Sequence, residues 1–141
     1  MAGASMPADG VKAWLRVVDT DVSSIVNNLD GPEPCATAAA FHCQQAAEKI
    51  VKAILVSSAI AFPKSHDIGA LIRLLPPDHP LVPEVAPLAR FTPFVAVFRY
   101  PGASFMDAMV EEPSIEEIRD WLAELRATVA TVRAALLPPP A

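Results

Sequence analysis

The stretch that decides the fold is Ala36 to Ser58, ATAAAFHCQQAAEKIVKAILVSS. Its apolar side chains recur at steps of three and four, which places them on one face of an α-helix. The members of this face are Ala39, Cys43, Ala47, Ile50, Val51, Ile54 and Leu55. The sequence therefore predicts one long, alanine-rich helix over residues 36–60, and Pro63 is expected to stop it.

The opposite face of this helix is polar. Four long polar side chains share a stripe within about 60° of Gln45 at 100° per residue, namely Gln45, Glu48, Lys49 and Lys52. One interpretation is a solvated face with a weak Glu48–Lys52 pair, worth about 0.3–0.5 kcal/mol. Phe41 lies on the same side of the helix, however, and an aromatic side chain that faced only water would leave its apolar surface unburied. We therefore expect a second packed surface, with this helix at the centre of the bundle or of a dimer interface.

Two more long amphipathic helices flank the central one in the sequence. Residues 11–29 carry an apolar face that ends at the GPEP turn, residues 31–34. Near the C-terminus Ser114 stands three residues before Glu117, which is the spacing of a capping box. An apolar stripe then continues to the terminal prolines, which cannot extend a helix.

Prolines interrupt the chain between residues 60 and 113. Ser65 or Asp67 is placed to cap a short third helix. The segment 82–99 contains Pro87 and Pro93, and each removes a backbone donor, so we expect a kinked or two-piece helix there.

No segment shows the alternation of a strand bounded by hairpin turns. The predicted fold is all-α, an antiparallel up-and-down bundle of four or five helices that forms a dimer. The whole chain, 1–141, is expected to be one domain. Its core spans about 11–137, and residues 138–141 form a proline-rich tail.

The composition limits the classes of protein. The chain has 141 residues, 52% of them hydrophobic and 19% charged, which suits one globular domain rather than a disordered chain. No apolar run reaches the ~18 residues that a membrane span needs, and the N-terminus lacks the parts of a signal peptide. We therefore expect a cytoplasmic protein without membrane contact. Because the net charge is −5, any contact with nucleic acid would be local.

The sequence contains no recognisable metal or cofactor pattern. Cys35 and Cys43 lack C-x-x-C spacing and are interpreted as ordinary thiols rather than as a disulfide. The histidines at 42, 66 and 79 form no short-range metal pattern, and no glycine-rich phosphate loop is present. We expect no metal and no cofactor.

Three motifs follow one another in a recognisable order. They are FHCQQAAEK at residues 41–49 with Lys52 after it, PKSHD at 63–67, and RYP at 99–101. Together with the opening from Trp14 to Asp21, they resemble the HEPN domain family of bacteria and archaea over about residues 11–137. The resemblance implies a helical bundle, usually a homodimer, with nucleotide or RNA contacts in the cleft between subunits. It also implies either a ribonuclease or toxin with an R-x4-6-H motif, or the partner of a small nucleotidyltransferase in a toxin–antitoxin pair.

The ribonuclease motif is incomplete after Arg99, because no histidine stands four to six residues beyond it. Arginine can stabilise charge on a phosphorane but cannot move a proton, whereas histidine ordinarily titrates near neutral pH. His66 or His42 would have to supply that group from elsewhere in the fold. The alternative for His66 is that it caps the helix that follows. Enzymatic activity is therefore left open, with Arg99 and His66 as the catalytic candidates and no activity as the preferred interpretation.

Binding a nucleotide requires fewer functional groups than cleaving RNA. The planar guanidinium of Arg99 is suited to a phosphate, and the only tyrosine, Tyr100, offers a ring on which a base can stack. The expected nucleotide-binding residues are Lys49, Lys52, Arg99 and Tyr100. The alternative is that Arg99 pairs internally with Glu48 and binds no ligand. The expected structural polar network consists of Gln45, Glu48 and His66.

Three functions remain open from the sequence. The preferred one is a HEPN-type module that binds nucleotide or RNA phosphate and works with a small nucleotidyltransferase. The second is a metal-independent endoribonuclease with a rearranged active site. The third is a non-catalytic structural dimer in which the polar stripe is an internal ion network.

Overall fold

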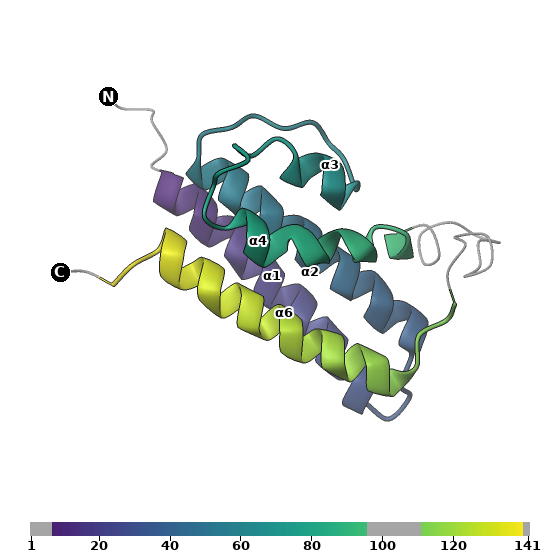
Figure 1. The fold of residues 1–141 in the computed structure, drawn as a ribbon. Coiled ribbons are helices and arrows are strands. Elements are labelled where there is room, and N and C mark those ends of the chain that lie inside the picture. The colour runs from purple at the N-terminus through teal and green to yellow at the C-terminus, as the bar shows by residue number, and fades with distance from the viewer. Residues whose placement is uncertain (1–6, 96–110, 140–141) are drawn as a thin grey trace.

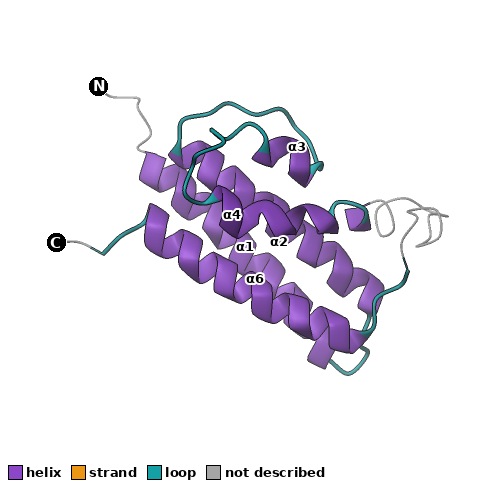
Figure 2. Cartoon of the chain, in the orientation of Figure 1, coloured by secondary structure: helices purple, strands orange, loops and turns teal. Residues whose placement is uncertain are grey.

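The computed structural model describes residues 7–95 and 111–139, and within them all regular structure is helical (Figure 2). The elements are α1 (Pro7–Asp30), α2 (Ala36–Ser57), α3 (Ile68–Ile72), α4 (Val82–Val85), the 3₁₀ helix η1 (Ala86–Phe91) and α6 (Ile115–Leu136). The predicted all-α bundle is thus confirmed. None of the described helices is long and apolar enough to cross a membrane.

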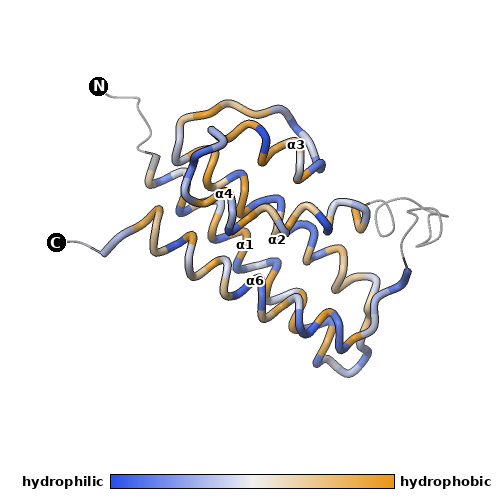
Figure 3. Tube along the Cα trace, in the orientation of Figure 1, coloured by the Kyte–Doolittle hydropathy of each residue, from blue (hydrophilic) through white to orange (hydrophobic). Residues whose placement is uncertain are grey.

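The bundle alternates in direction. Figure 1 shows α1 antiparallel to both α2 and α6, with the α4–η1 segment running back beside α2. α2 contacts α1, α6, α3 and η1, which makes it the central helix, as the sequence predicts. Figure 3 shows apolar and polar residues alternating along the long helices, as expected for helices that bury one face. The short GPEP connection between α1 and α2 favours their antiparallel packing.

Local sequence signals explain most helix ends. Asp67 caps α3, because its Oδ1 accepts a hydrogen bond from the Ala70 backbone N at 3.0 Å. Ser114 and Glu117 form the predicted capping box at the start of α6. Between residues 82 and 91 the helix is split into α4 and η1, each with a proline in its first turn. This confirms the predicted two-piece helix as far as residue 95; residues 96–99 of that segment lie outside the described residues.

The end of α2 was predicted wrongly. The helix ends at Ser57, not at the predicted residue 60, and Ala59 takes a left-handed conformation with φ of 56°. The Ile60 backbone N donates back to the Leu55 carbonyl at 2.9 Å, which satisfies one of the helix's last carbonyls. The chain therefore leaves the helix two turns before the residue expected to stop it.

The core beneath these helices is continuous and apolar. Among the described residues its largest fully buried side chain is Phe91, whose ring packs edge-on against Trp121 with centroids 5.3 Å apart. Cys43 is buried and Cys35 is exposed, and both are free thiols, as the sequence indicates. Burial raises the pKa of the Cys43 thiol to about 12, although the nearby Arg90 acts to lower it.

Candidate functional site

On the polar face of α2, Glu48 and Lys52 are buried, and Gln45 and Lys49 are half-buried. Glu48 is 3% exposed and Lys52 is 8% exposed, so the interpretation of this stripe as a solvated face is wrong. The second packed surface expected there is supplied on α2 by Trp14 of α1 and by Phe62, whose rings meet edge-on at 6.1 Å. The Lys52 Nζ lies 5.6 Å from the Trp14 ring centroid and 5.8 Å from that of Phe62, a position suited to cation–π attraction.

Glu48 is the centre of a hydrogen-bonded cluster. Its Oε2 accepts from the Lys52 Nζ at 2.9 Å, and its Oε1 accepts from the Gln44 Nε2 at 2.9 Å. The same Oε1 lies 2.8 Å from the His66 Nδ1. Gln45 joins the cluster through its Nε2, which donates to the Gln44 Oε1 at 2.6 Å. We call this set, consisting of Gln44, Gln45, Glu48, Lys52 and His66, the Glu48 cluster.

The cluster keeps the Glu48 carboxyl ionised. Burial acts to raise the pKa of Glu48, but hydrogen bonds from Lys52, His66 and Gln44 together outweigh it, so the pKa lies below its ordinary value. The buried negative charge therefore depends on its donors. It also fixes the His66 ring, because the Nδ1 contact determines how the imidazole is oriented.

A second carboxylate builds a similar arrangement from α1. The Asp21 Oδ1 lies 2.9 Å from the His42 Nδ1, and its Oδ2 accepts from the Lys49 Nζ at 2.8 Å. The Asp21 side chain is 7% exposed, against 25% for His42 and 18% for Lys49. We call these three residues the Asp21 cluster. It lies on the other flank of the polar stripe from Glu48, since residues 42 and 49 share one edge of α2.

The two clusters have the same charge pattern. In each, one carboxylate holds a lysine on one oxygen and a histidine on the other. With the histidine neutral the lysine and the carboxylate cancel, and with the histidine protonated the cluster carries one positive charge. The histidines are also the more exposed members of the two pairs, with 41% exposure for the His66 side chain. The arrangement can therefore bind an anion or transfer a proton at its histidines.

The structure places the residues expected at the site in different surroundings. Lys49 and Lys52 belong to different clusters, and each is paired with an acid. Arg99 and Tyr100 lie outside the described residues, and so does the alternative pairing of Arg99 with Glu48. His66 does not cap α3, because the neighbouring Asp67 does. Gln45, Glu48 and His66 lie in one cluster.

Sequence reasoning missed two members of these clusters, Asp21 and Gln44. Asp21 follows Trp14 by seven residues, two helical turns, which puts both on the face of α1 that meets the polar stripe. The sequence signal for Asp21 was therefore an acidic residue on the same face of the first helix as a tryptophan. Gln44 lies outside the stripe, about 100° from Gln45, and gave no signal of its own.

Comparison with known proteins identifies the class. The HEPN domain family model matches residues 11–134, which is most of the chain, and the observed helical bundle agrees with this match. The chain therefore belongs to the HEPN family of nucleotide- or RNA-related helical modules. No curated protein and no solved structure matches the chain significantly.

Proposed function

We propose that the chain is a HEPN-type module that binds a phosphate group of a nucleotide or an RNA at the exposed edge of the Glu48 cluster. The observation that carries this proposal is the His66–Glu48 pair. A buried carboxylate holds one ring nitrogen of a histidine that is 41% exposed, with Lys52 on the second carboxylate oxygen. A protonated imidazole fixed in this way is a charge-assisted donor to phosphate.

The proposal makes binding depend on pH. Lys52 is already compensated by Glu48, so the cluster gains a positive charge only when His66 is protonated. Phosphate binding should therefore be stronger with His66 protonated than with it neutral, and it should weaken with salt because the contact is electrostatic.

The test is titration calorimetry with a panel of nucleotides and a short single-stranded RNA between pH 6 and pH 8. His66→Gln should weaken binding and remove its pH dependence. His79→Gln is the matched control, because His79 belongs to neither cluster and contacts Ser58 and the Leu81 backbone instead. Unchanged affinity in His66→Gln, or no heat with any ligand in the unmodified protein, would overturn the proposal.

A partner and an assembly are also part of the proposal. By family resemblance we propose that the module forms a homodimer and works with a small nucleotidyltransferase protein, as in toxin–antitoxin pairs. Arg99 and Tyr100, which follow the described part of the α4–η1 segment in sequence, are proposed to add a guanidinium and a stacking ring to the phosphate site. Co-purification of a tagged chain with the product of an adjacent nucleotidyltransferase gene tests the partner. Sedimentation equilibrium tests the dimer.

A second candidate function is favoured by the two histidine–carboxylate pairs. An endoribonuclease needs one group that takes the proton of the ribose 2′-hydroxyl and another that protonates the leaving oxygen. His66–Glu48 and His42–Asp21 offer two histidines, each oriented by a carboxylate. Cleavage of labelled RNA by the purified chain, lost in both His66→Gln and His42→Gln, would establish this activity. RNA that stays intact from pH 6 to pH 8 would exclude it.

A further inference from the structure

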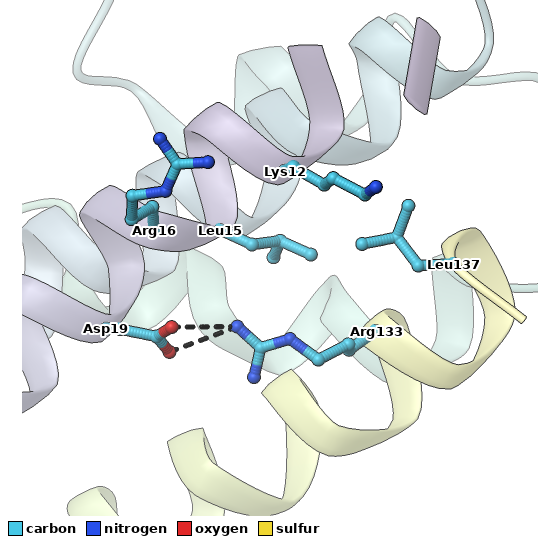
Figure 4. Close-up of a pocket in the computed structure, with 6 residues that line it drawn as sticks. All are labelled: Lys12, Leu15, Arg16, Asp19, Arg133 and Leu137. Carbon is cyan, nitrogen blue, oxygen red and sulfur yellow. Dashed lines mark hydrogen bonds and ion pairs between the residues drawn. The ribbon is translucent and has the colours of Figure 1, made fainter. Parts of the chain in front are cut away.

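A hollow of about 220 Å³ lies between the N-terminal half of α1 and the C-terminal end of α6 (Figure 4). Its lining consists of Lys12, Leu15, Arg16, Asp19, Arg133 and Leu137. Figure 4 shows Lys12 reaching across from α1 above Leu15, with Arg133 on the facing side from α6. Cationic side chains from two helices therefore line one open hollow with an apolar floor.

This hollow is separate from the α2 clusters. Residues 12, 16 and 19 lie within about 60° of one another around α1, whereas Asp21 lies about 180° from Lys12. Asp21 faces α2, where it holds His42 and Lys49. The two faces of α1 therefore carry two different polar sites, and a substitution in one leaves the contacts of the other in place.

The hollow holds more positive charge than its own acids neutralise. Arg133 donates through one nitrogen to both oxygens of Asp19, at 3.1 and 2.9 Å, so the charges of these two side chains neutralise each other. Lys12 and Arg16 are exposed and take part in none of the ion pairs among the described residues. They stand four residues apart on α1, where like charges repel each other. Two uncompensated cations thus gather at one place in a protein whose net charge is −5.

We propose that this hollow is a second anion site, which binds a phosphate group of a nucleotide or of an RNA strand. Lys12, Arg16 and the unpaired edge of the Arg133 guanidinium supply the donors, and arginine suits phosphate because its donors are planar and paired. Leu15 and Leu137 provide apolar walls for the attached sugar. The volume is below the ~300–1,000 Å³ of pockets that enclose whole ligands. The site therefore takes one phosphate with its sugar rather than an entire nucleotide.

The proposal is tested by fluorescence titration of a labelled short oligouridine over a range of salt. Lys12→Ala with Arg16→Ala should lower the affinity about tenfold and reduce the slope of log affinity against log salt by ~1–2. Asp19→Asn should raise the affinity and increase the salt slope, because it releases Arg133 from the Asp19 carboxylate. The matched control is Arg73→Ala with Arg126→Ala, which removes two exposed cations that line neither this hollow nor the α2 clusters and have no ion pair among the described residues. All four residues are exposed, so the variants should fold.

Amide signals in NMR spectra separate this site from the proposed α2 site. Oligouridine should shift the signals of residues 12–19 and 133–137, and these shifts should persist in His66→Gln. Pyrophosphate should compete for the same signals, because the proposed site binds phosphate itself, and failure to compete would overturn the proposal. Equal losses of affinity in the two double variants, or no shift at residues 12–19 and 133–137, would overturn it.

Discussion

Replacing Glu48 by glutamine tests the central electrostatic feature of the fold. The substitution keeps the shape and one acceptor oxygen but removes the charge that compensates the buried Lys52 and contacts His66. Breaking a buried ion pair by removing one partner costs about 3–5 kcal/mol. Because glutamine can still accept a hydrogen bond, we expect a loss of about 2–4 kcal/mol in the free energy of unfolding at pH 7. For a domain of this size that corresponds to a fall in Tm on the order of 10 °C.

The same substitution should change how stability depends on acid. The pKa of Glu48 in the native state is below its ordinary value of 4.5. A lowered carboxyl pKa contributes stability that is fully present above the ordinary value and is lost as pH falls through the native value. The unmodified protein should therefore lose this contribution below about pH 4.5, and Glu48→Gln should not show that part of the loss.

The assay is urea unfolding followed by circular dichroism, at pH 7 and at steps down to pH 3. Glu48→Gln combined with Lys52→Met provides the internal control, because it removes the unpaired charge and leaves an apolar side chain between Trp14 and Phe62. The double variant should recover most of the lost stability. A loss below about 1 kcal/mol in Glu48→Gln, or an unchanged acid dependence, would refute a buried, mutually dependent pair.

Three further expectations follow from the described contacts. At pH 8 the native protein should take up one maleimide per chain, at the exposed Cys35, and a second at Cys43 only in denaturant, because burial raises the pKa of Cys43 to about 12. Mass spectrometry counts the adducts, and rapid double labelling of the native chain would contradict this prediction. Ser114→Ala should lower stability by about 1 kcal/mol in urea unfolding through loss of the capping box, and Ser114→Asp, which can still cap, should not. Phe91→Ala should cost about 3–5 kcal/mol, because it empties a fully buried position against Trp121, and a loss under about 1 kcal/mol would contradict that packing.

The fold was predictable because its signals are local. The three long helices follow from apolar spacing, and Ser114 and Asp67 start their helices through hydrogen bonds to backbone groups only three residues away. The end of α2 was not predictable in the same way. Its stop depends on a left-handed Ala59, a conformation that alanine rarely takes, and no residue type marks it.

The site was less predictable because its contacts join distant parts of the chain. The lysines, Glu48 and His66 stand out as residue types, yet their partners depend on which helices pack together. Asp21 binds Lys49 from 28 positions away, and His66 reaches Glu48 across 18. Phe41 predicted a second packed surface over the stripe, but the sequence gave no sign that Trp14 and Phe62 supply it or that they bury the Glu48–Lys52 pair.

Because the lysines of the α2 clusters are paired with acids, another group must supply the positive charge that binds an anion. Had Lys49 and Lys52 been uncompensated, they would attract phosphate at every pH, but Asp21 and Glu48 neutralise them. At the α2 clusters the added charge therefore has to come from histidine protonation. At the α1–α6 hollow it comes from Lys12 and Arg16, which belong to no histidine–carboxylate pair. The two sites should thus differ in their response to pH. The part of oligouridine binding that changes with pH should be lost in His66→Gln, and the part that does not change should be lost in Lys12→Ala with Arg16→Ala. If all binding followed a single pH profile in every variant, this division of roles would be wrong.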